Sequence, residues 1–364
     1  MEMRRVDHNE FGELLLGTQY SNFTSSEDVR SRLKPLGEWI KKNIPEKLYR
    51  YRVYSDYSLE ALKNDEIWGS SIVTFNDPFE CLPRYDHKKI HEYIDSEFSS
   101  ETVSQNLHNI TANKTPQKVL EAYPDGFADD YISGNKKIPD MELLADMLVV
   151  IKDWFEKSWE HNREELDGIF YDGIAESAGK YRIACFSETN SSVLMWSHYA
   201  RSHTGFCVEY DIKSVLGDCA ETCADICSCP GFMLNHHIAP VIYSEERYDA
   251  SLSFMSMLLN RMTEKYCVPV GEIHHDMLST IKTMLVKSKN WEYEKEWRLI
   301  SNPAEGECAE HGVITKMKPS AVFVGAKMKP KETRALAEIC NEKRIPLYKM
   351  GIQFYSTRFE CTLL

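Results

Sequence analysis

The stretch Lys47-Leu-Tyr-Arg-Tyr-Arg-Val-Tyr54 sets the fold of this chain. Its aromatic and β-branched residues alternate in a way that predicts a β-strand. The alternation puts Arg50 and Arg52 on one face of the strand and Tyr49 and Tyr51 on the other. Each arginine presents a planar fork that can hold a diphosphate or a carboxylate, so both are candidate anion-binding residues. In the alternative interpretation, one arginine pairs with an acidic neighbour and the other lies at the surface.

Strand and helix patterns continue on both sides of this stretch. Together they predict an α+β fold with a mixed, largely antiparallel central sheet that is split around a cleft. The expected strands lie at residues 67–73, 181–187, 205–210, 240–243, 321–325 and 345–350. The expected helices lie at residues 25–42, 58–64, 193–201, 251–266, 272–289 and 331–343.

These patterns also suggest how the chain is organised. Residues 1–46 are expected to form an N-terminal helical extension, and residues 47–350 the main α+β domain. A helical insertion at about 86–180 and a cysteine-rich insertion at about 218–237 interrupt that domain. The strand, helix and strand after residue 321 predict a C-terminal β-α-β unit, with residues 351–364 left as a tail.

Composition narrows the class of protein. The 364 residues include 43 Lys and Arg against 56 Asp and Glu, a formal net charge of −13, which disfavours binding to an extended nucleic acid. No run of about 18 apolar residues and no secretion-signal core is present, so no membrane partner is expected. The 11 cysteines, an odd number, are typical of reduced thiols in the cytosol. We therefore expect a folded cytoplasmic protein.

Two further segments are richer in polar and aromatic groups than packing requires. Phe75-Asn-Asp-Pro-Phe-Glu80 is a turn sequence that could frame a ligand or simply reverse the chain. Cys185-Phe-Ser187 and Leu194-Met-Trp-Ser-His-Tyr-Ala200 could supply a Cys-His or Ser-His nucleophile, although His198 fits a structural role equally well. The candidate ligand-binding residues in these segments are Asn76, Asp77, Glu80, Ser187, Trp196, Ser197, His198 and Tyr199.

Trp291-Glu-Tyr-Glu-Lys-Glu-Trp-Arg298 carries the densest charge. As a strand it would place Glu292, Glu294, Glu296 and Arg298 on one face, which makes Arg298 a further candidate ligand-binding residue. Carboxylates side by side repel one another unless a cation or a hydroxyl-rich ligand meets them, so this pattern predicts a partner. As a helix the same residues would scatter around the axis, with Glu294 and Arg298 forming an ordinary i,i+4 pair.

A cysteine cluster is the remaining candidate site. Four thiolates within eleven residues are enough to enclose a tetrahedral zinc ion. The first three cysteines also lie four residues apart, as in a buried helical stripe, and this second interpretation is preferred over zinc. The residues are Cys219, Cys223, Cys227 and Cys229.

Several of these motifs, taken in order, resemble the bacterial family called domain of unknown function 2971. They are Leu48-Tyr-Arg-Tyr-Arg, Phe75-Asn-Asp-Pro-Phe-Glu, Cys185-Phe-Ser, Met195-Trp-Ser-His-Tyr-Ala, Trp291-x-Tyr-Glu-Lys-Glu-Trp-Arg and Val324-Gly-Ala-Lys-Met. The resemblance runs from about Leu48 to Met350, and the two insertions look like additions to the family pattern. It implies no particular activity.

The order of arginine, serine and Glu-x-Glu is also similar to that in the arginine-serine-glutamate ADP-ribosyltransferases. This similarity implies an NAD-consuming enzyme in which Arg50 or Arg52 holds the diphosphate and Ser187 orients the nicotinamide ribose. Glu296 would stabilise positive charge on the sugar, Glu294 would position or deprotonate the acceptor, and Tyr51 or Trp196 would stack on nicotinamide.

NAD is then a substrate, the acceptor is an unidentified macromolecule, and a bacterial toxin or phage-defence effector is the implied role. One alternative is a non-enzymatic module that senses a ligand or partner. The other is a metal-dependent hydrolase or nuclease that uses Asp77, Glu80, His198 and Glu296.

Overall fold

The computed structural model describes residues 6–20, 24–97, 99–112, 114, 127–135, 137, 141–217, 237–266, 276–302, 311–353, 355–356 and 358–364. Its core is a mixed, mostly antiparallel open sheet, in the order β12-β11-β10-β4-β1-β3-β2-β9, with β8 pairing to β3 and β5. The predicted α+β fold is thereby confirmed. The strands are β1 Lys47–Arg52, β2 Glu66–Ser70, β3 Arg182–Ser187, β4 Phe206–Asp211, β5 Ile238–Pro240, β8 Glu296–Ser301, β9 His311–Lys316, β10 Ala321–Val324, β11 Leu347–Ile352 and β12 Phe359–Leu363.

The sheet divides at β3. Along one edge, β3 pairs with β8 over its whole length, from Arg182 to Ser187. Along the other edge, β1 meets one end of β3 through Tyr49 and Ser187, and β2 meets the other end through Ser70 and Ile183. The two strands therefore diverge from β3, and the expected split in the sheet is observed.

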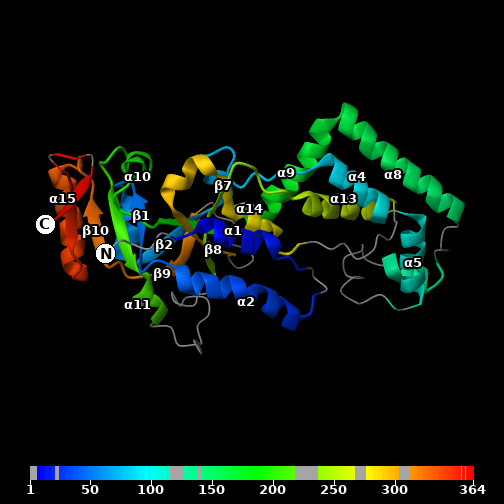
Figure 1. The fold of residues 1–364 in the computed structure, drawn as a ribbon, viewed down its shortest axis with the longest axis horizontal. Helices are drawn as coiled ribbons and strands as arrows, with labels where there is room; N and C mark the ends of the chain where they lie inside the picture. The colour runs from blue at the N-terminus through cyan, green and yellow to red at the C-terminus, as the bar shows by residue number, and fades with distance from the viewer. Residues whose placement is uncertain are drawn as a thin grey trace.

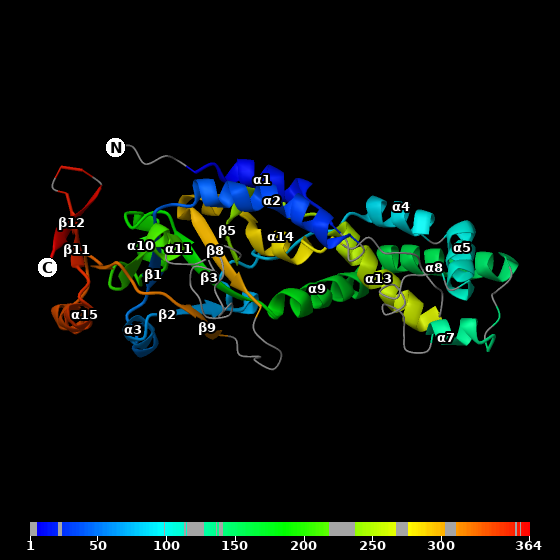
Figure 2. The same ribbon diagram turned by 90° about the horizontal axis from the view of Figure 1, so that it is seen from below.

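Helices from both ends of the chain cover the sheet. The helix α1 (His8–Gly17) begins at Asp7, whose carboxylate accepts the Asn9 N–H, and buries Phe11 in the sheet core. The helix α2 (Ser26–Asn43) contributes Trp39 to the same core and runs unbroken across a proline. In Figure 2, α1 and α2 lie along one side of the strands. The short α3 (Asp56–Lys63) follows β1.

The C-terminal unit has the expected β-α-β order. The strands β10 and β11 are parallel and are joined by α15 (Pro330–Lys343). The residues expected to form a tail include a further strand, because β12 pairs antiparallel with β11. Figure 1 shows this unit at one end of the molecule.

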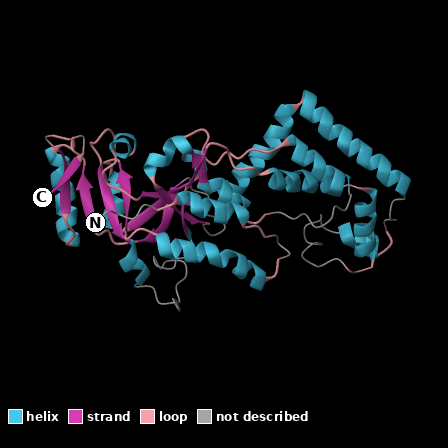
Figure 3. Cartoon of the chain, viewed as in Figure 1, coloured by secondary structure: helices cyan, strands magenta, loops and turns pink. Residues whose placement is uncertain are grey.

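The other end of the molecule consists of helices (Figure 3). They enclose a second apolar core, separate from the sheet core, that includes the fully buried Phe170 and Phe254. The helices are α4 His87–Glu97, α5 Ser100–Thr111, α7 Phe127–Ile132, α8 Met141–His161, α9 Arg163–Gly179 and α13 Ser251–Tyr266. Within the described residues, no helix is long and apolar enough to span a bilayer.

Two expected elements differ from those observed. The helix expected up to residue 289 is the shorter α14 (Ser279–Leu285), and the strand β7 (Val286–Ser288) follows it directly. The strand expected at 240–243 is divided into β5 and β6 (Ile242–Ser244). Both differences arise because β6 pairs with β7 in a separate two-stranded sheet, whereas β5 pairs with β8.

Candidate functional site

A cavity of about 420 Å³ lies where β1 and β2 diverge from β3. Residues from β1, β3, the turn after β2, the helix α10 (Val193–His198) and the segment before β8 line it. These segments are far apart in the sequence, and the split sheet brings them together. The predicted site residues that line the cavity are Arg50, Tyr51, Arg52, Asn76, Glu80, Ser187, His198, Tyr199, Glu294 and Glu296.

Three buried carboxylates converge on one lysine at the base of this cavity. Lys287 Nζ lies 2.6 Å from Glu294 Oε2, 2.9 Å from Glu296 Oε2 and 3.3 Å from Glu80 Oε1. All four side chains are at least 95% buried. The cation that the acidic pattern predicted is therefore supplied by the chain itself, from β7.

Arg298 completes this charged cluster from the side that faces away from the cavity lining. Its guanidinium is fully buried, and its Nε donates to Glu296 Oε1 at 2.8 Å. It also pairs with Glu80 and donates to the Met284 carbonyl. Arg298 does not line the cavity, so it holds the carboxylates rather than facing a ligand. We call Glu80, Glu294, Glu296, Lys287 and Arg298 the charged cluster.

Neighbouring hydroxyl groups fix the position of Glu294. Tyr199 Oη donates to Glu294 Oε1 at 2.5 Å, and Ser187 Oγ donates to the Glu294 carbonyl at 2.7 Å. Burial, followed by repulsion from Glu296, raises the pKa of Glu294 to about 7. Burial opposes the charge on Lys287, but Glu296 and Glu294 together raise its pKa well above the usual value. The cluster thus holds a carboxyl group that can exchange a proton near neutral pH.

The local backbone explains why both glutamates reach Lys287. Residues Lys289–Glu294 form the 3-10 helix η2, capped by Ser288, and the strand β8 begins only at Glu296. Between them, Lys295 has a φ of 47°, in the left-handed region. The expected four-residue strand face is therefore wrong for this segment, and Glu292 is exposed on the surface. The turn at Lys295 brings Glu294 back beside Glu296.

The two arginines of β1 have different surroundings. Arg50 donates to the Trp68 carbonyl and lies 5.7 Å from the ring centroid of Phe186. Burial, and then repulsion from Arg52, lower the pKa of Arg50 to about 10. Arg52 lines the same cavity, and its guanidinium makes no hydrogen bond or ion pair to another described residue. Arg52 is therefore the guanidinium that remains available to an anion.

Besides Arg298, three predicted residues lie outside the cavity lining. Trp196 is fully buried, donates to the Asn190 carbonyl at 2.6 Å and packs edge-on against Tyr51. Ser197 donates to the Val193 carbonyl, with His203 Nε2 3.1 Å from its hydroxyl. Asp77 is buried in its turn, where one oxygen accepts the Phe79 N–H at 2.9 Å. The sequence could not distinguish these structural positions from cavity positions, because residue type does not determine orientation.

Other lining residues were not predicted. Lys287 is the main example, since its segment continues a helical pattern and it lies seven residues before Glu294. The acidic run indicated that a cation was needed but not which one. Tyr49 and Phe75 also line the cavity, as does Cys185, which the sequence suggested only as a possible nucleophile.

The sequence left two sets of possible metal ligands open, the cysteine cluster and the acidic residues with His198. Cys219, Cys223, Cys227 and Cys229 lie outside the described residues. In the part of the chain that is described, no group of three or more His, Cys, Asp or Glu side chains is placed to hold a metal ion. At the cavity, the ammonium group of Lys287 occupies the position between the carboxylates.

The fold and the site define an α+β protein with a charged cluster at the base of a cavity in a split sheet. Residues 195–299 match a family described as Protein of unknown function (DUF2971), which confirms the expected resemblance. The match covers most of α10, all of η2 and most of β8, and it ends within the strand that carries Glu296. It therefore spans only part of the expected range from Leu48 to Met350. No curated protein and no solved structure gives a significant match.

Proposed function

We propose that the cavity binds NAD and that the charged cluster cleaves the bond between nicotinamide and ribose, as in an ADP-ribosyltransferase or NAD glycohydrolase. One observation carries the proposal. Arg52, Ser187 and the pair Glu294 and Glu296, which come from three separate segments of the chain, border a single cavity. The proposed toxin or defence role and the cytoplasmic location remain predictions.

Arg52, Glu296 and Glu294 each have a part in the proposed reaction, and Ser187 holds Glu294 through its carbonyl. The guanidinium of Arg52, which has no partner among the described residues, pairs with the diphosphate. As the ribose–nitrogen bond breaks, its electron pair leaves with nicotinamide, and the carboxylate of Glu296 stabilises the positive charge on the sugar. Water or an acceptor hydroxyl then forms the new bond to the ribose carbon that lost nicotinamide, and the proton of that water or hydroxyl passes to Glu294.

The test is nicotinamide release from NAD, measured by mass spectrometry. Wild-type protein should release nicotinamide, whereas Glu296→Gln should lower the rate by at least about a hundredfold, as expected when transition-state charge stabilisation is lost. Glu292→Gln is the matched control, because Glu292 belongs to the same acidic run but is exposed outside the charged cluster. Equal background release from wild type and Glu296→Gln would remove the catalytic proposal.

A second candidate function is ligand binding without catalysis. It is favoured by the pairing of both Glu296 oxygens, one with Arg298 and the other with Lys287. In that case the cluster shapes a binding cavity and performs no chemistry. Thermal shift would then reveal stabilisation by NAD with no nicotinamide released, since a ligand at about a hundred times its Kd adds about 2.7 kcal/mol.

A further inference from the structure

Three aromatic rings lie together at one side of the cavity, where His198 lines it. The ring of His198 lies 6.1 Å from that of Trp291 and 6.4 Å from that of Tyr293, and the last two are 5.9 Å apart. His198 is exposed and lines the cavity, and the other two are half-buried on η2. We call His198, Trp291 and Tyr293 the aromatic rim.

The rim differs from the aromatic pair that the sequence suggested for stacking. Tyr51 and Trp196 are buried against each other, and both polar tips donate to backbone carbonyls. In contrast, the ring nitrogens of His198 make no hydrogen bond to a described residue, and part of the Trp291 surface faces solvent. The rings of the rim therefore have surface that is accessible for stacking, whereas the rings of Tyr51 and Trp196 have little accessible surface.

The rim is also continuous with the charged cluster. Lys287 Nζ lies 5.3 Å from the ring centroid of Trp291, and Tyr199, which follows His198, donates to Glu294. One nucleoside could thus place its planar ring on the rim and its sugar beside Glu296. The unpaired Arg52 borders the same cavity and fits the phosphate of such a molecule.

We propose that the aromatic rim stacks on the heterocyclic ring of a nucleotide whose phosphate pairs with Arg52. This deepens the proposed function and rests on it for the ligand class. Stacking suits this surface because every base has a π-face, so half-exposed rings bind bases without a hydrogen-bonding code. The ring is either adenine or nicotinamide, and both are planar nitrogen heterocycles carried on ribose phosphate.

The experiment compares three probes by calorimetry on the full chain: AMP, nicotinamide mononucleotide and ribose 5-phosphate. At least one ring-bearing probe should bind about tenfold or more tightly than ribose 5-phosphate, the range for one stacked base. Trp291→Leu should remove this advantage and leave ribose 5-phosphate binding unchanged. Trp291→Phe should retain most of it, which separates stacking from a folding defect.

Tyr355→Leu is the matched control, because Tyr355 is 94% exposed in the segment between β11 and β12, and it should bind all probes as wild type does. Equal affinity for the three probes, no binding of any probe, or an equal loss of all three in Trp291→Leu would each overturn the proposal. Nicotinamide release is followed in the same samples. A protein that binds the ring but releases no nicotinamide would contradict only the proposed chemistry.

Discussion

Lys287 is the residue on which the charged cluster depends. Removing one partner from a buried ion pair leaves an uncompensated charge, at a cost of roughly 3–5 kcal/mol. We therefore expect Lys287→Met to lower the free energy of unfolding in urea by about that amount. Lys289→Met is the control, because the one ion pair of Lys289 with a described residue, to Glu245, is exposed, and its loss should change stability by less than about 1 kcal/mol. Similar stabilities for the two variants would contradict the buried arrangement.

The raised pKa of Glu294 gives a second prediction at this scale. Burial and the neighbouring Glu296 move this pKa from 4.5 to about 7. Between these two pH values the native state therefore binds one more proton than the unfolded state. The stabilisation that comes from protonating Glu294 is complete below about pH 4.5 and is lost as the pH rises through 7. Urea unfolding across this range should show wild type losing stability relative to Glu294→Gln, and parallel curves would contradict the shift. Nicotinamide release should rise over the same interval, because the base form of Glu294 accepts the proton.

The two arginines of β1 should separate binding from stability. Arg52→Gln should weaken NAD binding by about tenfold or more, since a charge-assisted contact with phosphate is lost, and should hardly change unfolding. Arg50→Gln should lower stability by about 1.5–3 kcal/mol, the range for a hydrogen bond from a charged group. Calorimetry and urea titration on both variants provide the check, and the opposite pattern would reverse the assignment.

At the scale of elements, the sequence predicted the strands that form the site better than it predicted their connections. Alternation identified β1, and the apolar run before Ser187 identified β3. The segment before β8 was harder, because a left-handed residue at Lys295 interrupts a pattern that otherwise reads as one strand. The split in the sheet was expected. The pairing of β6 with β7, which positions Lys287 in the charged cluster, could not be predicted from the residues around Lys287.

Two backbone segments cross closely where β4 begins and β10 ends, and this crossing depends on glycine. A Cβ on Gly325 would lie 2.2 Å from the His203 carbonyl oxygen, which is backbone and cannot move aside cheaply. Gly325→Ala should therefore destabilise the protein by several kcal/mol and weaken the end of the sheet near α10. Gly312→Ala is the control, because no atom of a described residue other than its chain neighbours lies within 4 Å of the added carbon. Thermal unfolding of both variants tests the crossing.

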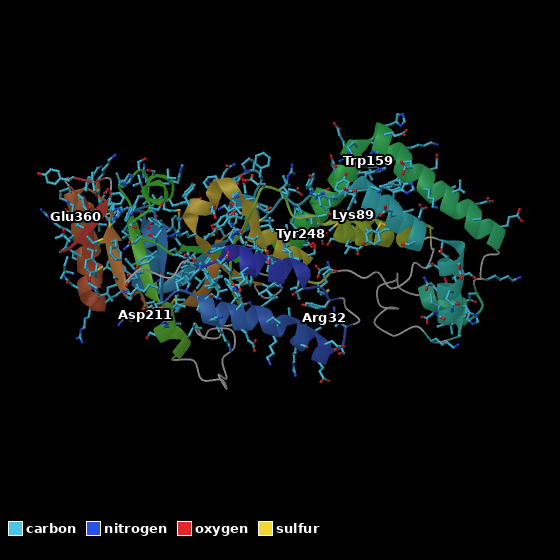
Figure 4. All side chains as sticks on the ribbon, in the orientation of Figure 1. Arg32, Lys89, Trp159, Asp211, Tyr248 and Glu360 are labelled. Carbon is cyan, nitrogen blue, oxygen red and sulfur yellow. The ribbon has the colours of Figure 1, made fainter. Side chains whose placement is uncertain are left out.

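At the scale of the whole molecule, the sheet and the helices have separate apolar cores (Figure 4 shows Trp159 and Lys89 among the helices and Glu360 at the far end). Phe254→Ala should cost about 3–5 kcal/mol, since the side chain is fully buried in the helical core. Hydrogen exchange should then accelerate in α4, α9 and α13 and remain unchanged in β3 and β8. Val149→Ala, at a 66% exposed position of α8, is the control. Equal acceleration in both regions would mean that the cores unfold as one unit.

The meeting of β1, β2 and β8 on β3 also has a consequence for how the protein is made. A ribosome releases Arg52 and Ser187 long before Glu296, and only the late segment completes the base of the cavity. Contacts so distant along the chain form slowly, because the intervening polypeptide must first be ordered. A nascent polypeptide therefore lacks the complete cavity until translation has passed residue 296.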